Sequence, residues 1–170
     1  AAGYDGRELA PFTLASRITD VTSTQRVELR QQAAEAGVEI IGLHWLLAKT
    51  EGLYLTSPDH AVREQTTGYL VELAKCCHDL GGHLMVFGSP KQRSLLPGVS
   101  RGQAFGCAAE TFRRAMPAIA DLGVTICMEP LAPADTDFVI TCAEGVRLVE
   151  MVSHPNFVLH LDVKAMCSEP

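Results

Sequence analysis

Cys127-Met128-Glu129-Pro130-Leu131 and Leu159-His160-Leu161-Asp162 are the stretches that decide the fold. Each contains a short apolar run that ends in one acid, Glu129 in the first and Asp162 in the second. In an α/β barrel, chemistry takes place at the carboxyl ends of the buried parallel strands. Two such acids on consecutive strands predict half of a metal site. The sequence ends eight residues after Asp162, so we expect a fragment that lacks the other half.

Outward from these acids, the chain repeats one pattern: a helix cap, an apolar stripe at helical spacing, a glycine and an apolar strand. Capping boxes, in which two side chains satisfy reciprocal backbone amides, are predicted at Thr22–Gln25, Ser100–Gln103 and Thr141–Glu144. Ser57 and Pro58 predict the N-cap and first residue of a further helix. The predicted strands span residues 6–10, 38–45, 83–88, 124–129 and 157–162.

Five strands that alternate with four helices predict a parallel sheet with right-handed crossovers and strands adjacent in chain order. An open doubly wound sheet fits the same alternation, but no GxGxxG motif follows a strand. A barrel has eight strands in roughly 250 residues. We therefore predict an α/β fold in which residues 1–170 form one domain, a partial (β/α)8 TIM barrel of about five parallel strands.

The composition is that of an ordinary globular protein, with 47% hydrophobic and 20% charged residues. A net charge of −6 argues against a nucleic-acid partner, which favours a basic face. The six cysteines form no CxxC motif, which predicts reduced structural thiols and a cytoplasmic location. Because no apolar run approaches the ~20 residues of a membrane span, no membrane partner is expected.

Motifs along the whole chain carry a family resemblance. They are Gly3-Tyr-Asp-Gly-Arg-Glu-Leu9, Gly42-Leu-His-Trp-Leu46, Phe87-Gly-Ser-Pro90, Met128-Glu-Pro-Leu131 and Leu161-Asp162. In order and spacing they resemble the sugar phosphate isomerase/epimerase family, the xylose isomerase-like TIM barrels that include the ketose 3-epimerases. The Glu-Pro-Leu and His-Leu-Asp pair is fairly specific, and the other motifs are weak singly. The resemblance implies that the chain contains strands two to six of the family barrel.

The resemblance also implies roles for individual residues. Glu129 matches the family's first metal-binding glutamate, and Asp162 matches the metal-binding aspartate of the next strand. The family completes the site with a His on strand seven and a Glu on strand eight, which have no counterpart here. Asp135 stands where the epimerases have a substrate-contacting glutamate. Where many members have a His, this chain has Ala165, and we interpret the neighbouring Lys164 as taking over part of its role.

The implied chemistry moves a proton on a carbon next to a sugar carbonyl. A divalent cation, Mn²⁺, Mg²⁺ or Co²⁺, suits a carboxylate-rich site and stabilises the enediolate that forms. Glu129 would bind the cation and also act as the base. The expected partner is a small-molecule sugar, with its identity, its phosphorylation and the choice between isomerisation and epimerisation left open.

Several residues keep two interpretations. Glu8 and His160 face the barrel interior by strand alternation, and His44 lies near the presumed pocket. For each, a hydrogen-bonded core residue and a substrate or metal contact both fit. Lys91 and Arg93 follow a strand end and form either a solvated loop pair or a contact to a phosphate or hydroxyl.

Two other function classes remain as alternatives. An endonuclease IV-like nuclease would share the barrel and both acids, but it needs additional histidines after the fourth strand. A folded fragment without catalysis is the other alternative. If 170 residues are the whole polypeptide, the open edges near residues 6–10 and 157–162 predict a homo-oligomer with little or no epimerase activity.

Overall fold

A computed structural model describes residues 3–169 and contains one parallel sheet. The strands are β1 (Gly6–Leu9), β2 (Glu39–His44), β3 (Leu84–Phe87), β4 (Thr125–Met128) and β5 (Phe157–Leu159). Neighbours in the sheet follow the order β1-β2-β3-β4-β5, and every neighbouring pair is parallel. The predicted strand order and direction are confirmed. The sheet is not closed, and β1 and β5 form its two edges.

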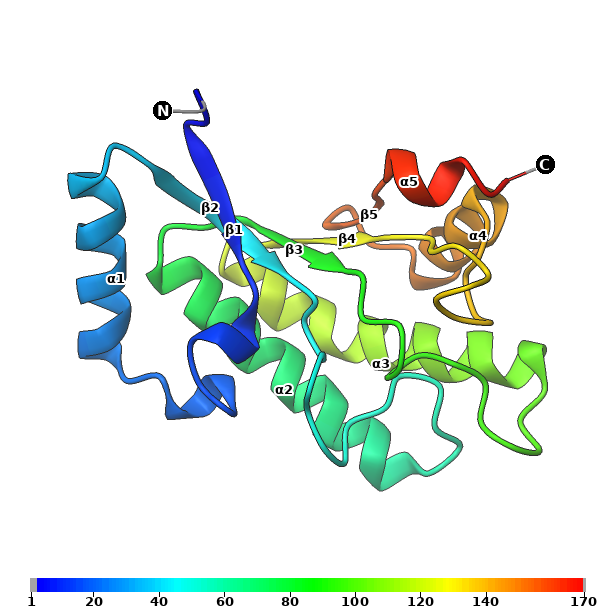
Figure 1. Ribbon diagram of the computed structural model, residues 1–170. Coiled ribbons are helices and arrows are strands. Elements are labelled where there is room, and N and C mark those ends of the chain that lie inside the picture. The colour runs from blue at the N-terminus through cyan, green and yellow to red at the C-terminus, as the bar shows by residue number, and fades with distance from the viewer. Residues whose placement is uncertain (1–2, 170) are drawn as a thin grey trace.

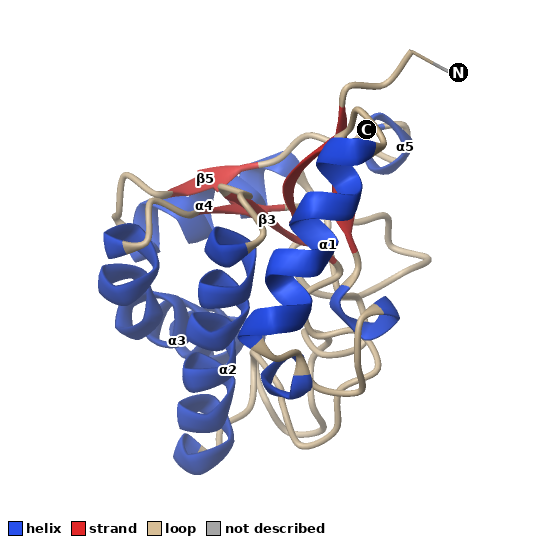
Figure 2. Ribbon diagram, turned by 90° about the vertical axis from the view of Figure 1, so that its left-hand side faces the viewer, coloured by secondary structure: helices blue, strands red, loops and turns tan. Residues whose placement is uncertain are grey.

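The helices lie mainly on one face of this sheet. They are α1 (Ser23–Glu35), α2 (His60–Asp79), α3 (Arg101–Asp121), α4 (Cys142–Val152) and the short α5 (Val163–Met166), with 3-10 turns η1 (Pro11–Thr13) and η2 (Ile18–Asp20). Figure 1 shows α2 and α3 side by side below the sheet and α5 above it, and the turned view in Figure 2 agrees. This is the layering of part of a TIM barrel, with the helices outside the strands. Within residues 3–169, each helix is too short or too polar to cross a membrane.

The core lies between the sheet and the two long helices, α2 and α3. The aromatic ring of Phe112 on α3 packs against Phe87 of β3 and Phe157 of β5, with ring centroids 5.3 and 4.6 Å apart. Each such aromatic pair adds about 0.5–1.5 kcal/mol beyond the area it buries. On α3, the apolar residues that recur at helical spacing are all buried: Phe105, Ala108, Phe112, Met116 and Ile119. Periodicity therefore located the buried face correctly.

Two of the predicted capping boxes are complete. In α1, Gln25 N donates to Thr22 Oγ1 at 3.3 Å and Thr22 N donates to Gln25 Oε1 at 2.8 Å. In α3, the matching bonds between Gln103 and Ser100 are 3.3 and 2.9 Å long. Both helices thus begin where the reciprocal bonds satisfy free amides of the first turn.

The third capping box is only half formed. Glu144 N donates to Thr141 Oγ1 at 3.2 Å, but the Glu144 carboxylate does not return to the N-cap amide. One oxygen accepts from Arg101 Nη1 at 2.7 Å and the other from Ile140 N at 2.9 Å. The guanidinium of Arg101, the first residue of α3, therefore holds the Glu144 carboxylate away from the N-cap amide.

The predicted start of α2 is wrong by two residues. The N-cap is Asp59, whose Oδ1 accepts from Ala61 N at 2.8 Å. Ser57 Oγ instead accepts from Asp59 N at 3.2 Å, so that it forms a turn before the helix. An aspartate caps as well as a serine, and here it lies closer to the helix.

The last two strands end earlier than predicted. β4 stops one residue before Glu129, and β5 stops three residues before Asp162. One more backbone bond, from His160 N to Met128 O at 2.8 Å, continues the pairing beyond β5. Asp162 is therefore not the last residue of a strand. It is the N-cap of α5, and its Oδ1 accepts from Ala165 N at 2.8 Å.

Candidate metal and substrate site

A pocket of about 200 Å³, here called the carboxylate pocket, opens at the carboxyl ends of the strands. Its walls come from the segments that follow β2, β3, β4 and β5: Trp45, Gly88, Pro90, Glu129, Leu131, Asp135, Asp162, Lys164 and Ala165. Four residues that the sequence singled out, Glu129, Asp135, Asp162 and Lys164, thus come together in one place. This is the end of the sheet at which barrel enzymes carry their active sites.

A larger cavity of about 540 Å³ lies at the opposite ends of the strands, between α1 and β2. Arg30, Glu39 and His83 are among its lining residues. Residues at that end of a barrel serve stability rather than chemistry. We therefore place the candidate site in the smaller carboxylate pocket.

Glu129 is the most buried acid of the carboxylate pocket, with 9% of its surface exposed. Burial raises the pKa of the Glu129 carboxyl above its ordinary value. The negative charge of Asp162 raises this pKa further, whereas His160 and Arg93 lower it. Glu129 and Asp162 therefore interact electrostatically at the same end of the sheet, as a shared ion would require.

Gly88 makes room for the Glu129 carboxylate. A β-carbon on Gly88 would overlap Glu129 Oε2, so only glycine permits this close approach. Trp45, the residue after β2, covers the same spot, with its Cδ1 3.6 Å from where that β-carbon would be. Both residues lie in motifs of the family resemblance, but the sequence analysis assigned a role to neither. A glycine directly after a buried strand was the one available signal.

Asp135 and Lys164 form an ion pair at the pocket wall. Lys164 Nζ donates to Asp135 Oδ2 at 2.9 Å and so links α5 to the loop after β4. The hydrogen bond and the charge of Asp135 raise the pKa of Lys164. The lysine side chain is 78% exposed, and exposed ion pairs add little stability. The substrate-contact role predicted for both residues stays a prediction.

Glu8 and His44 lie on the neighbouring strands β1 and β2 and contact each other, with His44 Nδ1 3.5 Å from Glu8 Oε2. Neither residue lines the carboxylate pocket. The charge of Glu8 nevertheless contributes to the raised pKa values of Cys127 and Glu129, so its carboxylate acts on the inner face. A substrate contact by either residue stays a prediction.

Lys91 and Arg93 do not form the solvated pair that was one interpretation of the sequence. Lys91 is exposed, but Arg93 is fully buried. Arg93 Nη1 donates to the backbone oxygens of Glu129 at 2.7 Å and Phe87 at 3.4 Å. Such burial depends on packing between distant segments, so local sequence carried no signal for it.

The fit to a metal ion rests on two carboxylates. Within residues 3–169, no group of three or more His, Cys, Asp or Glu side chains is arranged to hold a metal. Glu129 and Asp162 supply oxygen ligands, which hard divalent cations prefer. Burial is the main cause of the raised pKa of Glu129, and a cation between the two acids would offset the repulsion that Asp162 adds to it. The two residues thus fit Mg²⁺ or Mn²⁺ as part of its ligand set.

An open parallel α/β barrel with paired acids at its carboxyl end defines the class of this protein. A family model described as xylose isomerase-like TIM barrel matches residues 1–169. The chain therefore belongs to the xylose isomerase-like TIM barrel family. A search of curated proteins found no significant match.

Three solved structures illustrate the likeness. A D-psicose 3-epimerase crystallised in the presence of D-fructose has a TM-score of 0.82 and 22% identity, over 98% of this chain and 56% of that one. An AP endonuclease of family 2 from Brucella melitensis has a TM-score of 0.70 and 18% identity, over 96% and 60%. An IOLI protein with a bound zinc atom has a TM-score of 0.69 and 17% identity, over 96% and 54%. At these identities the likeness shows the fold alone, and the chain spans little more than half of each structure.

Proposed function

We propose that this chain is part of a metal-dependent sugar isomerase or epimerase. The observation that carries the proposal is the carboxylate pocket, in which Glu129 and Asp162 lie together at the carboxyl ends of β4 and β5. The family membership supports it, as do the likeness to a D-psicose 3-epimerase and the zinc atom of the IOLI structure. Glu129 and Asp162 would hold the cation, and Glu129 would also move the proton.

The chemistry assigned to these side chains is a proton transfer next to a carbonyl. When bound, Mn²⁺, Mg²⁺ or Co²⁺ would polarise the sugar carbonyl and its neighbouring hydroxyl. A Glu129 carboxylate oxygen takes the proton from the adjacent carbon and later returns it. Because burial raises the pKa of Glu129, its carboxylate is a stronger base and takes the proton more readily. Asp135 and Lys164, which pair with each other at the pocket wall, would bind sugar hydroxyls.

Partners and location follow from the same features. All six cysteines are free thiols, which favours a reducing, cytoplasmic setting. The expected partner is a small sugar. A homo-oligomer stays a prediction for the case that 170 residues are the whole polypeptide, because β1 and β5 would then leave backbone groups for a second copy.

The nuclease alternative is disfavoured by charge. The carboxylate pocket contains three acids and one lysine, and the chain carries a net charge of −6. A nucleic-acid phosphate backbone is attracted by basic residues, so the acidic net charge disfavours it. An abasic-site nicking assay should therefore show no cleavage.

Exchange of a sugar proton with solvent deuterium tests the proposal, because this exchange needs only one base. We would incubate the chain with Mn²⁺ and a panel of free and phosphorylated ketoses in D₂O, and follow deuterium at the carbon next to the carbonyl by NMR. We expect slow exchange with little net epimerisation, because inversion needs a base on each face of the carbon. The variant Glu129→Gln should abolish the exchange.

The outcomes separate the alternatives. Mn²⁺ binding with no exchange in any ketose would contradict the base role of Glu129. Absence of Mn²⁺ binding would favour the non-catalytic fragment. Exchange that persists in Glu129→Gln would assign the proton transfer to another residue.

A further inference from the structure

Arg93 is a buried cation without an acidic partner in the part of the chain that the structure describes. It follows β3, and none of its surface is exposed. Its hydrogen bonds within residues 3–169 go to the backbone oxygens of Glu129 and Phe87, and its Nε and Nη2 atoms have no partner there. Buried charges are normally paired, so an arginine kept in this state calls for an explanation.

The two carbonyl groups that Arg93 contacts belong to the ends of β3 and β4. Glu129 N donates to Phe87 O at 3.3 Å, a long bond that closes the ladder between these strands. The bond from Arg93 Nη1 to Glu129 O, at 2.7 Å, is much shorter. It fixes the peptide group between Glu129 and Pro130, directly beyond the last rung of the ladder.

Other contacts already anchor the loop that carries Arg93. Thr56 Oγ1 and Tyr54 Oη donate to Ser94 O at 2.8 and 3.0 Å, and Leu95 N donates to Asp137 Oδ1 at 2.7 Å. The loop after β3 is therefore tied to the loops after β2 and β4 without Arg93. Arg93 adds a direct hydrogen bond to the backbone oxygen of Glu129.

We propose that Arg93 is a positioning residue that fixes the Glu129 backbone and so keeps the Glu129 carboxylate in its place over Gly88. This inference rests on the proposed function of Glu129 as metal ligand and base. Gly88 provides the space for the carboxylate, and Arg93 provides the restraint that keeps it there. Release of the restraint lets the carboxylate leave its place beside Gly88 in the carboxylate pocket, which Asp162 also lines.

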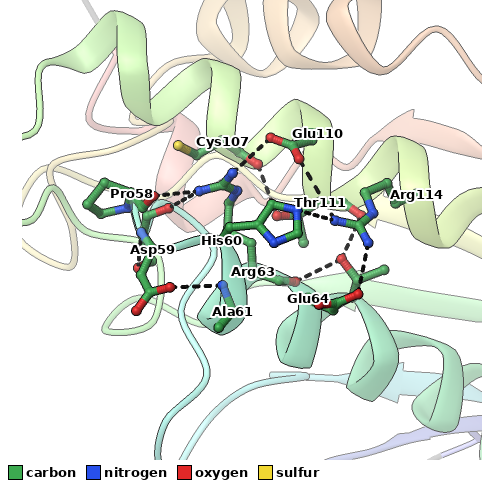
Figure 3. Close-up of polar contacts among 12 residues, drawn as sticks. Pro58, Asp59, His60, Ala61, Arg63, Glu64, Cys107, Glu110, Thr111 and Arg114 are labelled. Carbon is green, nitrogen blue, oxygen red and sulfur yellow. Dashed lines mark hydrogen bonds and ion pairs between the residues drawn. The ribbon is translucent and has the colours of Figure 1, made fainter.

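Arg63 offers a matched control for a buried arginine. Figure 3 shows it between the start of α2 and Glu110 of α3, and it too donates to backbone oxygens, those of Ser57 and Pro58, both at 2.9 Å. Its third bond, to Glu110 Oε2, is 3.0 Å long. None of these residues lines the carboxylate pocket. Arg63→Met therefore removes a buried guanidinium without touching the site.

The first test measures the Mn²⁺ dissociation constant by electron paramagnetic resonance for the wild-type chain, Arg93→Met, Arg93→Lys and Arg63→Met, each checked for folding by circular dichroism. We expect Arg93→Met to weaken Mn²⁺ binding about tenfold to a hundredfold, the usual effect of losing a group that orients a ligand. Arg93→Lys should recover part of the affinity. Arg63→Met should leave it within about twofold. Equal weakening by Arg63→Met, or no weakening by Arg93→Met, would overturn the proposal.

The second test is the crystal structure of Arg93→Met, which decides the matter even if the wild-type chain binds no Mn²⁺. Displacement of the Glu129 carboxylate from Gly88 supports the positioning role. An unmoved carboxylate overturns it. Failure of wild-type Mn²⁺ binding alone would count against the proposed function, not against this role of Arg93.

Discussion

Gly88→Ala moves Glu129 without changing any charge. The new β-carbon would overlap Glu129 Oε2. Because non-bonded atoms rest at about 3.5 Å or more, the carboxylate must shift by roughly an ångström or more, unless the ends of β3 and β4 move apart. Gly88 is not among the glycines with positive φ, so alanine brings no backbone strain. The effect is therefore steric and local.

The expected magnitude follows from that displacement. Metal–oxygen bonds to Mg²⁺-like cations are about 2.0–2.1 Å long, so a ligand shifted by an ångström no longer coordinates. We expect the Mn²⁺ dissociation constant to rise at least tenfold, in the range of about 10–100-fold found for disturbed ligand shells. Overpacking of this kind lowers the free energy of unfolding by about 1–3 kcal/mol.

The assay combines Mn²⁺ titration by electron paramagnetic resonance with urea denaturation. Gly106→Ala on α3 is the matched control, because a β-carbon there meets no atom within 4 Å. It should leave Mn²⁺ binding unchanged and stabilise the chain by about 0.4–1 kcal/mol. A folded Gly88→Ala protein with wild-type Mn²⁺ affinity would refute the reasoning.

Three further predictions concern stability and thiol chemistry. Ser100→Ala removes the capping box of α3 and should lower the free energy of unfolding by about 1 kcal/mol; an unchanged urea midpoint would show that the cap is unimportant. Burial raises the pKa of Cys76 to about 11 and that of Cys77 to about 12, from an ordinary value of 9.0. Their contribution to stability is therefore constant below pH 9 and lost as the pH rises through 11 to 12, because unfolded thiols ionise first. At pH 8 a thiol reagent should label the exposed Cys167 in the native protein but neither Cys76 nor Cys77, and labelling of either would contradict their burial.

Local signals in the sequence were sufficient for the architecture. Thr22 and Ser100 mark helix starts because the reciprocal bonds of a capping box depend only on residues three apart. Strand order followed because right-handed crossovers place successive parallel strands side by side. Glu129 and Asp162 were brought to one pocket by the same rule, since their strands are neighbours.

The predictions from the sequence were wrong or incomplete where a residue's position depends on packing between distant segments. The edge strand β5 has a partner on one side only, so it ends early and leaves Asp162 to cap α5. Burial of Arg93 depends on loops that follow two different strands, and the need for Gly88 depends on where the Glu129 side chain lies. Periodicity contains no information about such contacts between distant segments.

The central claim is that Glu129 and Asp162 bind one divalent cation. Anomalous X-ray scattering from a crystal of this chain soaked in Mn²⁺ tests it most directly. We predict a single strong peak in the carboxylate pocket, bonded to a carboxylate oxygen of each acid at roughly 2.0–2.2 Å. A peak that contacts only one of the two acids, a peak confined to the cavity at the opposite ends of the strands, or no peak would contradict the account.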